Sequence, residues 1–138
     1  MDPFTSPEAL AFVAMTRFLH RIAQEGAVEL ASFGLTPAKF QLLVQIRSRP
    51  GVAQWQLAEV AGVTKGNISQ LVKKVEEAGF VLRVRNQGTD ELAITDSGET
   101  LLAEVVPAHN AFMTRTFASL AADELDMLRR LVGRLGPS

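Results

Sequence analysis

Two short helix-forming segments with a glycine-containing turn between them constrain the fold of this chain most strongly. The first segment, 54–61, ends at Gly62-Val63, and Thr64 is in position to cap the second segment, 65–78. Residues 80–85 follow directly and mix apolar and basic side chains in the manner of a strand. Two short helices joined by such a turn are typical of a helix-turn-helix, and a β-hairpin behind the second helix makes the motif winged.

The rest of the chain is predicted to be helical apart from the hairpin. Residues 86–91 form the expected polar turn around Gly88, and 92–95 form the second strand. Apolar side chains recur at helical spacing in further segments. These are a long first helix up to Phe33-Gly34, a helix opened by Thr36-Pro37 and ended by Pro50-Gly51, a long helix opened by the capping box Asp96-Ser97-Gly98-Glu99, and a last helix at 123–135. We therefore expect a mainly α chain with a small β-hairpin wing, that is, a winged helix-turn-helix.

The length and the hydrophobicity of the chain bound its organisation. At 138 residues, 1–138 is one domain by length. Hydrophobic residues make up 47% of it, yet no apolar run approaches the roughly 20 residues that a membrane-spanning helix needs. The surplus apolar surface, at helical spacing in the first and last helices, indicates a homodimer interface. The absence of a signal or transit pattern favours the cytoplasm, without membrane association. Residues 1–5 resemble a vector-derived leader, and a native disordered start would look similar.

The chemistry available to the chain argues against an enzyme. There is no cysteine, which excludes disulfides and thiolate metal sites. The only histidines, His20 and His109, belong to no spaced set of metal ligands and lie beside no nucleophile motif. We therefore expect no catalytic activity, no metal and no cofactor.

Positive charge is concentrated in the segment that contains the second short helix and the strand after it. The whole chain has a formal net charge of −1, whereas 64–85 carries five basic and two acidic residues, a net charge of +3. A local basic patch of this kind indicates a nucleic-acid partner even where the overall charge does not. We therefore expect the protein to bind double-stranded DNA.

The predicted recognition helix begins with small polar side chains, as suits a helix that enters the major groove. Asn67 and Gln70 are expected to read bases, because an amide can bond adenine through two hydrogen bonds. Lysine and arginine side chains would mostly neutralise phosphates. The full predicted set comprises Thr64, Lys65, Gly66, Asn67, Ser69, Gln70, Lys73, Lys74, Arg83, Arg85, Asn86 and Gln87.

Several short motifs in combination resemble the multiple antibiotic resistance regulator (MarR) family of winged helix-turn-helix proteins. They are Leu35-Thr36-Pro37, Leu57-Ala58-Glu59, the run from Val63 to Ser69, the run from Val75 to Val81, Leu92-Ala93-Ile94-Thr95 with Gly98, and Glu124-Leu125 with Leu128-Arg129-Arg130-Leu131. The resemblance extends from about Pro7 to Leu135. It implies a repressor that binds a pseudo-palindromic operator as a homodimer and is released by a small aromatic or phenolic effector.

The same resemblance implies how the chain is divided. About 36–98 would form the DNA-binding lobe, and about 7–33 and 99–136 would form the dimerisation helices. An effector between these parts would meet a small set of side chains, namely Met15, Phe18, Arg47 and Phe112.

Two positions depart from the pattern of the family and leave an alternative open. The family commonly has arginine where this chain has Gln70, and Glu91 lies close to the position of a basic residue in the family's wing. A carboxylate at the wing tip would repel phosphates, which leaves Arg83 and Arg85 to hold the DNA backbone. The alternative is a winged-helix dimer that has lost strong DNA binding and acts through a protein partner, and the basic segment 64–85 favours DNA over it.

Overall fold

The chain folds into six helices and one small three-stranded sheet within the residues that the structure describes. The computed structural model describes residues 3–61 and 65–136, with the backbone alone given for 59–61, 65 and 66. The elements in chain order are α1 (Pro7–Ala31), α2 (Pro37–Ser48), β1 (Val52–Ala53), α3 (Gln54–Ala61), α4 (Lys65–Glu77), β2 (Val81–Asn86), β3 (Thr89–Ile94), α5 (Asp96–Thr116) and α6 (Ala122–Leu135). The strands pair antiparallel in the order β1-β3-β2. The predicted fold class, a mainly α chain with a small β wing, is confirmed.

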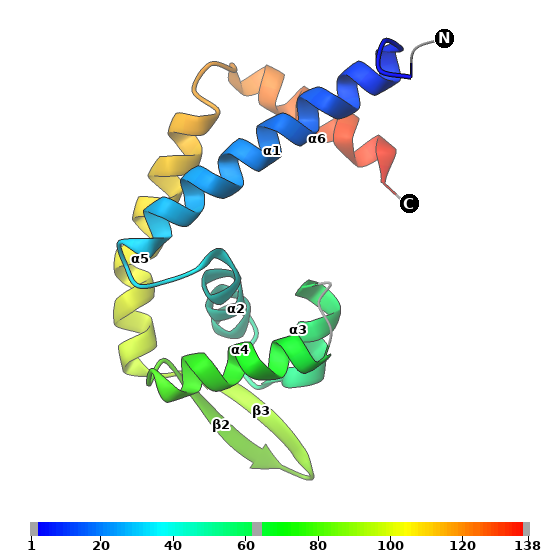
Figure 1. Ribbon diagram of the computed structural model, residues 1–138. Helices are drawn as coiled ribbons and strands as arrows, with labels where there is room; N and C mark the ends of the chain where they lie inside the picture. Colours follow the sequence, from blue (N-terminus) through cyan, green and yellow to red (C-terminus); the bar gives the residue numbers. More distant parts are fainter. Residues whose placement is uncertain (1–2, 62–64, 137–138) are drawn as a thin grey trace.

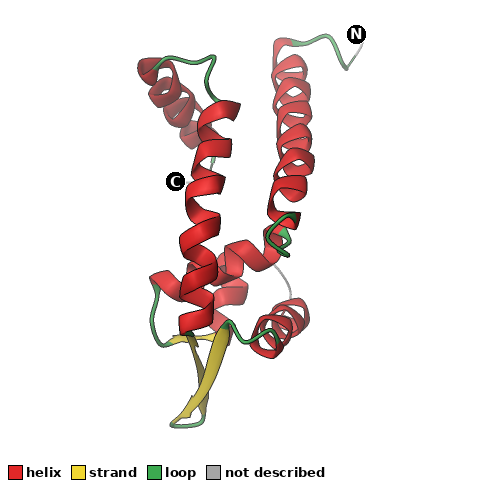
Figure 2. Cartoon of the chain, turned by 90° about the vertical axis from the view of Figure 1, so that its left-hand side faces the viewer, coloured by secondary structure: helices red, strands yellow, loops and turns green. Residues whose placement is uncertain are grey.

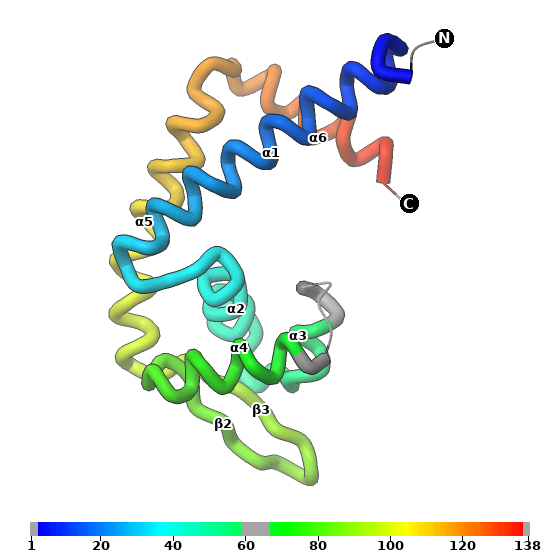
Figure 3. Tube along the Cα trace, viewed as in Figure 1, coloured from blue at the N-terminus to red at the C-terminus, as the bar shows by residue number. Residues whose placement is uncertain are grey.

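The elements are divided between two ends of the molecule. In Figure 1, α2, α3 and α4 gather around the sheet at the lower end, while α1, α5 and α6 extend away from it. Figure 2 shows the hairpin projecting from the end opposite the start of α1. α5 links the two ends, since it begins directly after β3 and runs beside α1, as the trace in Figure 3 shows. Within the described ranges, no helix is long and apolar enough to cross a membrane.

Threonine side chains cap the N-termini of α2 and α5. The hydroxyl of Thr36 accepts a hydrogen bond from the backbone N–H of Lys39 (3.2 Å) at the start of α2, as the Thr-Pro pair predicts. At α5 the cap is Thr95, whose hydroxyl accepts from the N–H of Gly98 (3.1 Å). The predicted capping box that began at Asp96 is therefore wrong by one residue, because threonine already occupies the N-cap position.

The wing is a tight hairpin. β2 and β3 stay paired up to Asn86 and Thr89, which leaves only Gln87 and Gly88 in the turn. Both turn residues have positive φ, 51° and 81°, as a type I′ hairpin turn requires. The predicted turn over 86–91 is therefore too long, because the tight turn keeps the strands paired as far as their ends.

The hydrophobic core lies where the helix-turn-helix and the sheet pack against α5. Its largest fully buried side chains are Leu43 and Ile46 of α2, Leu57 of α3, Ile68, Val72 and Val75 of α4, Val81 and Leu92 of the sheet, and Leu102 and Val105 of α5. Helical spacing places the buried side chains of α4 on one face of that helix. The core therefore fixes α4 by its apolar face and leaves its polar face outside.

Gly98 lies at a close approach between the first turn of α5 and the residue before β2. A Cβ atom there would lie 2.4 Å from the carbonyl oxygen of Phe80. That carbonyl is held in place, since it accepts a hydrogen bond from the N–H of Thr95 (3.1 Å). The hydroxyl of Thr95 in turn donates to the carbonyl of Gly79 (2.6 Å). The joint between the wing and α5 therefore requires glycine at 98.

Gly98→Ala is expected to lower the free energy of unfolding by about 1–3 kcal/mol, because the added methyl group must push apart two hydrogen-bonded backbones. Gly26→Ala is the control, since Gly26 is also a buried helical glycine but its Cβ would meet the ring of Phe112 at an ordinary 3.6 Å. Urea unfolding followed by circular dichroism measures both variants. Equal stability of the two variant proteins would contradict the close approach.

Candidate nucleic-acid interface

α4 presents polar and basic side chains on the side away from the core. Its exposed residues include Asn67, Ser69, Gln70, Lys73 and Lys74, all of which belong to the predicted DNA-binding set. Of the other predicted residues on this helix, Lys65 and Gly66 form its first turn, where the backbone alone is described, and Thr64 lies outside the described residues. The structure thus brings the predicted residues with described side chains onto one exposed surface of α4.

Part of this surface is a hollow shared with the first turn of α2. Asn67, Gln70 and Lys74 line it together with Leu71 and Ala38. Two amides that are able to bond base edges therefore lie next to a lysine that is able to neutralise a phosphate. The N-terminus of α2 adds partial positive charge at the same place, because the peptide dipoles of a helix sum to a positive N-terminal end.

Arg83 of β2 is engaged within the protein. Its guanidinium donates to Asp90 (3.1 Å), to Gln54 (3.1 Å) and to Glu76 (3.4 Å). Burial opposes the charge of this guanidinium, but the hydrogen bond to Asp90 and the charge of Glu76 outweigh it, so that the pKa of Arg83 lies above its ordinary value. Only 28% of its side chain is exposed. Arg83 therefore ties the wing to α3 and α4 through its Nε and Nη1 atoms.

The end of the wing combines one exposed arginine with amide side chains. The side chain of Arg85 is 72% exposed and lies 3.4 Å from the carboxylate of Asp90. Asn86 and Gln87 are exposed, and the amide of Asn86 donates to the carboxylate of Glu91 (3.1 Å). Glu91 is the third residue of β3 and pairs with Val84, so that the carboxylate expected at the tip lies further back along the strand, where it accepts the hydrogen bond from Asn86.

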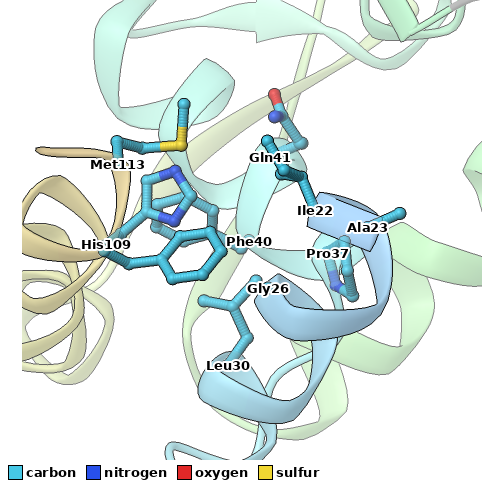
Figure 4. A pocket seen from close by; sticks show the side chains of 10 residues that line it. Ile22, Ala23, Gly26, Leu30, Pro37, Phe40, Gln41, His109 and Met113 are labelled. Carbon is cyan, nitrogen blue, oxygen red and sulfur yellow. The ribbon is translucent and has the colours of Figure 1, made fainter. Parts of the chain in front are cut away.

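A second candidate site is a pocket between α1, α2 and α5 (Figure 4). Its lining residues are Ile22, Ala23, Gly26, Leu30, Pro37, Phe40, Gln41, His109, Phe112 and Met113. Of the four predicted effector contacts, only Phe112 lines this pocket. Met15 and Phe18 line a separate hollow between α1 and the region where α5 meets α6. Arg47 points elsewhere, since it forms an ion pair with Glu99 (3.5 Å) at the start of α5.

The comparisons with known proteins agree with this geometry. A family model of MarR proteins matches residues 33–90. The chain is 31% identical over 128 residues to an uncharacterized HTH-type transcriptional regulator of Bacillus cereus, which covers 92% of this chain and 87% of the relative. The fold is similar to that of a MarR-family transcriptional regulator from Rhodococcus, with a TM-score of 0.84, 20% identity, and coverage of 95% of this chain and 96% of the other.

A MarR family protein of Mycobacterium tuberculosis is also similar and has been solved in two complexes. In the complex with DNA, the TM-score is 0.74 at 25% identity, covering 91% of this chain and 96% of the other. In the complex with p-aminosalicylic acid, the TM-score is 0.72 at 25% identity, covering 91% and 97%. The sequence relationship to the Bacillus cereus protein spans nearly the whole of this chain, beyond the segment that the family model matches. The chain therefore belongs to the MarR family of winged helix-turn-helix, DNA-binding transcriptional regulators.

Proposed function

We propose that the protein represses transcription by binding a pseudo-palindromic operator as a homodimer, and that a small aromatic effector releases it. The observation that carries this proposal is α4, whose apolar face is buried and whose exposed face carries amide and lysine side chains. Such a helix is suited to the major groove, where each base pair presents a distinct pattern of donors and acceptors. The related mycobacterial protein solved with DNA supports this function.

Selection of bound sites from random DNA with the full-length protein tests the proposal. We expect an inverted repeat whose half-site centres lie about 10 base pairs apart, or a multiple of that, because a twofold axis relates the two recognition helices. The repeat should occur upstream of the gene that the protein represses, and added protein should reduce transcription from that promoter in vitro. Enrichment of a site without any repeat would contradict dimeric binding.

The terminal helices supply the proposed dimer interface. No residue of α6 is buried, and its apolar side includes Leu131 and Leu135, which are 47% and 76% exposed. On α1, Phe12 and Leu19 are likewise exposed. Monomeric proteins rarely leave apolar helix faces of this extent in water. A second copy of the chain is the partner that would cover them in a symmetric dimer.

The pocket between α1, α2 and α5 is the proposed effector site. One wall belongs to α2 of the winged helix-turn-helix, and the other walls belong to α1 and α5. A ligand that binds one arrangement of these helices better than another would shift the population toward that arrangement. The complex of the related mycobacterial protein with p-aminosalicylic acid supports an aromatic effector.

The alternative, a dimer that has lost strong DNA binding and acts through a protein partner, is not favoured. Leu82 and Val84 are exposed on the wing, which a protein-binding surface could use. The exposed Lys73 and Lys74 on α4 and the relationship to DNA-binding regulators favour DNA instead.

Glu91→Gln is expected to raise the affinity for DNA about threefold at low salt, because it removes a repulsive charge from each wing. The amide oxygen of glutamine keeps an acceptor for Asn86, so that the hairpin is preserved. Fluorescence anisotropy with labelled operator DNA measures the gain, which should fade as added salt screens the charge. Glu8→Gln, in the first turn of α1, is the matched control. If both variants bind like the wild type, Glu91 does not face the DNA.

A further inference from the structure

The pocket between α1, α2 and α5 has the size of one aromatic ring. Its volume is about 150 Å³, and an apolar cavity of about 150 Å³ is sufficient for a molecule such as benzene. Aliphatic and aromatic side chains form most of the lining, including Ile22, Leu30 and Phe40. The volume therefore favours a single-ring molecule.

One polar atom inside this apolar lining lacks a partner. Within the described part of the chain, Nδ1 of His109 is buried and has no hydrogen bond. The imidazole packs against the ring of Phe40, with the ring centroids 4.8 Å apart. The centroid of the Phe112 ring lies 6.2 Å from that of the imidazole. Figure 4 shows His109 beside Met113 and facing into the pocket. A buried ring nitrogen without a partner is costly, and a ligand with one hydrogen-bonding group would remove that cost.

The lining also determines which charge a ligand can carry. No lysine, arginine or acidic residue is among the lining residues. Besides His109, the lining has one polar side chain, that of Gln41, and it is exposed to solvent. A carboxylate in such a pocket would lose its hydration without gaining a cation, which is unfavourable. A hydroxyl needs only one hydrogen bond, which Nδ1 of His109 can accept in one neutral tautomer of the ring.

We propose that this pocket selects an uncharged single-ring phenol, and that His109 is the residue that recognises its hydroxyl group. The proposal deepens the proposed effector function and rests on it. His109 thereby distinguishes a phenol from an apolar ring of the same size, and the absence of a lining cation distinguishes a phenol from a benzoate.

Isothermal titration of the full-length protein with phenol, toluene and benzoate tests this selection. His109→Phe is expected to weaken phenol binding about tenfold, because the buried hydroxyl loses its partner, and to change toluene binding less than about twofold. In the wild type, benzoate is expected to bind at least about tenfold more weakly than phenol. His109→Asn keeps a polar group near the position of Nδ1, and it should recover part of the phenol affinity.

Two further variants separate the polar contact from changes in pocket shape. His20→Phe makes the same chemical change at the other histidine, which is exposed on α1, and it should leave both affinities unchanged. Gly26→Ala narrows the pocket toward Phe112, and it should weaken phenol and toluene equally.

The proposal is overturned if His109→Phe affects phenol and toluene alike, or if benzoate binds the wild type as tightly as phenol. Operator binding by the same protein samples, measured without ligand, distinguishes a failure of the pocket proposal from a failure of the proposed DNA-binding function. Intact operator binding with no binding of any of the three ligands would overturn the pocket proposal and leave DNA binding standing. A wild-type protein that does not bind the operator would overturn the proposed function itself.

Discussion

Gln70→Ala is expected to weaken operator binding by about 30-fold or more, because a bidentate amide–base contact contributes about 1–3 kcal/mol and the dimer makes it twice. Gln70 is exposed in the middle of α4 and lines the hollow that also contains Asn67 and Lys74. Affinity for DNA of unrelated sequence should change little, because phosphate contacts supply non-specific binding. The expected result is therefore a loss of specificity rather than a uniform loss of affinity.

The measurement for Gln70→Ala compares operator and unrelated DNA at one fixed salt concentration. Gln24→Ala, which removes the same exposed amide from α1, is the matched control and should bind like the wild type. Equal weakening on both DNAs would assign Gln70 to the backbone. An unchanged operator affinity would remove Gln70 from the interface.

Leu131→Glu is expected to convert the dimer to a monomer and to weaken operator binding by about a thousandfold or more, because each monomer then reaches only one half-site. The side chain lies on the apolar side of α6, where it is 47% exposed in the single chain. A glutamate buried there without a partner would have to be desolvated on association. The winged helix-turn-helix should stay folded, since its core contains no residue of α6.

Sedimentation velocity and operator titration measure the two effects of Leu131→Glu. Arg130→Glu places the same side chain at the next position, where the wild-type arginine is exposed and pairs with Asp126 (2.9 Å). This control protein should remain a dimer. A monomeric wild type, or a Leu131→Glu protein that still binds a full palindrome normally, would contradict the dimer interface.

The helices could be predicted from the sequence because their signals are local. Thr36-Pro37 opens α2 as expected, and the apolar residues of α4 recur at the spacing that buries Ile68, Val72 and Val75. Periodicity and capping act within one or two turns, so that no knowledge of the tertiary fold is needed. The cap of α5 was placed at Asp96 instead of Thr95, because both residue types are good N-caps and only the backbone decides between them.

The sheet could be predicted only in part, because its pairing joins residues that are distant in the sequence. β1 has two residues and no alternating pattern, and it becomes a strand only by pairing with β3. The pairing of Arg83 and Arg85 with Asp90 was also missed. A turn limited to Gln87-Gly88 would have indicated it, because the resulting register places Asp90 opposite Arg85.

The pocket was the least predictable feature. Gly26 and His109 lie far apart in the sequence, and the packing of α1 against α5 brings them to one pocket. His109 has no neighbouring motif that would have marked it. Among the residues expected there from the family resemblance, Arg47 is turned to Glu99, since α2 and α5 approach each other at the end near the wing.

Operator binding as a function of salt concentration tests most directly whether the protein binds DNA through the exposed face of α4. For wild-type protein and DNA that contains the selected repeat, the logarithm of the association constant should fall linearly with the logarithm of the salt concentration, by about 0.9 for each neutralised phosphate. Lys73 and Lys74 are exposed on α4 in each subunit. Lys73→Gln should therefore make the slope shallower by about two in the dimer. Absence of operator-specific binding at low salt, or a slope that Lys73→Gln does not change, would contradict DNA binding through this face of α4.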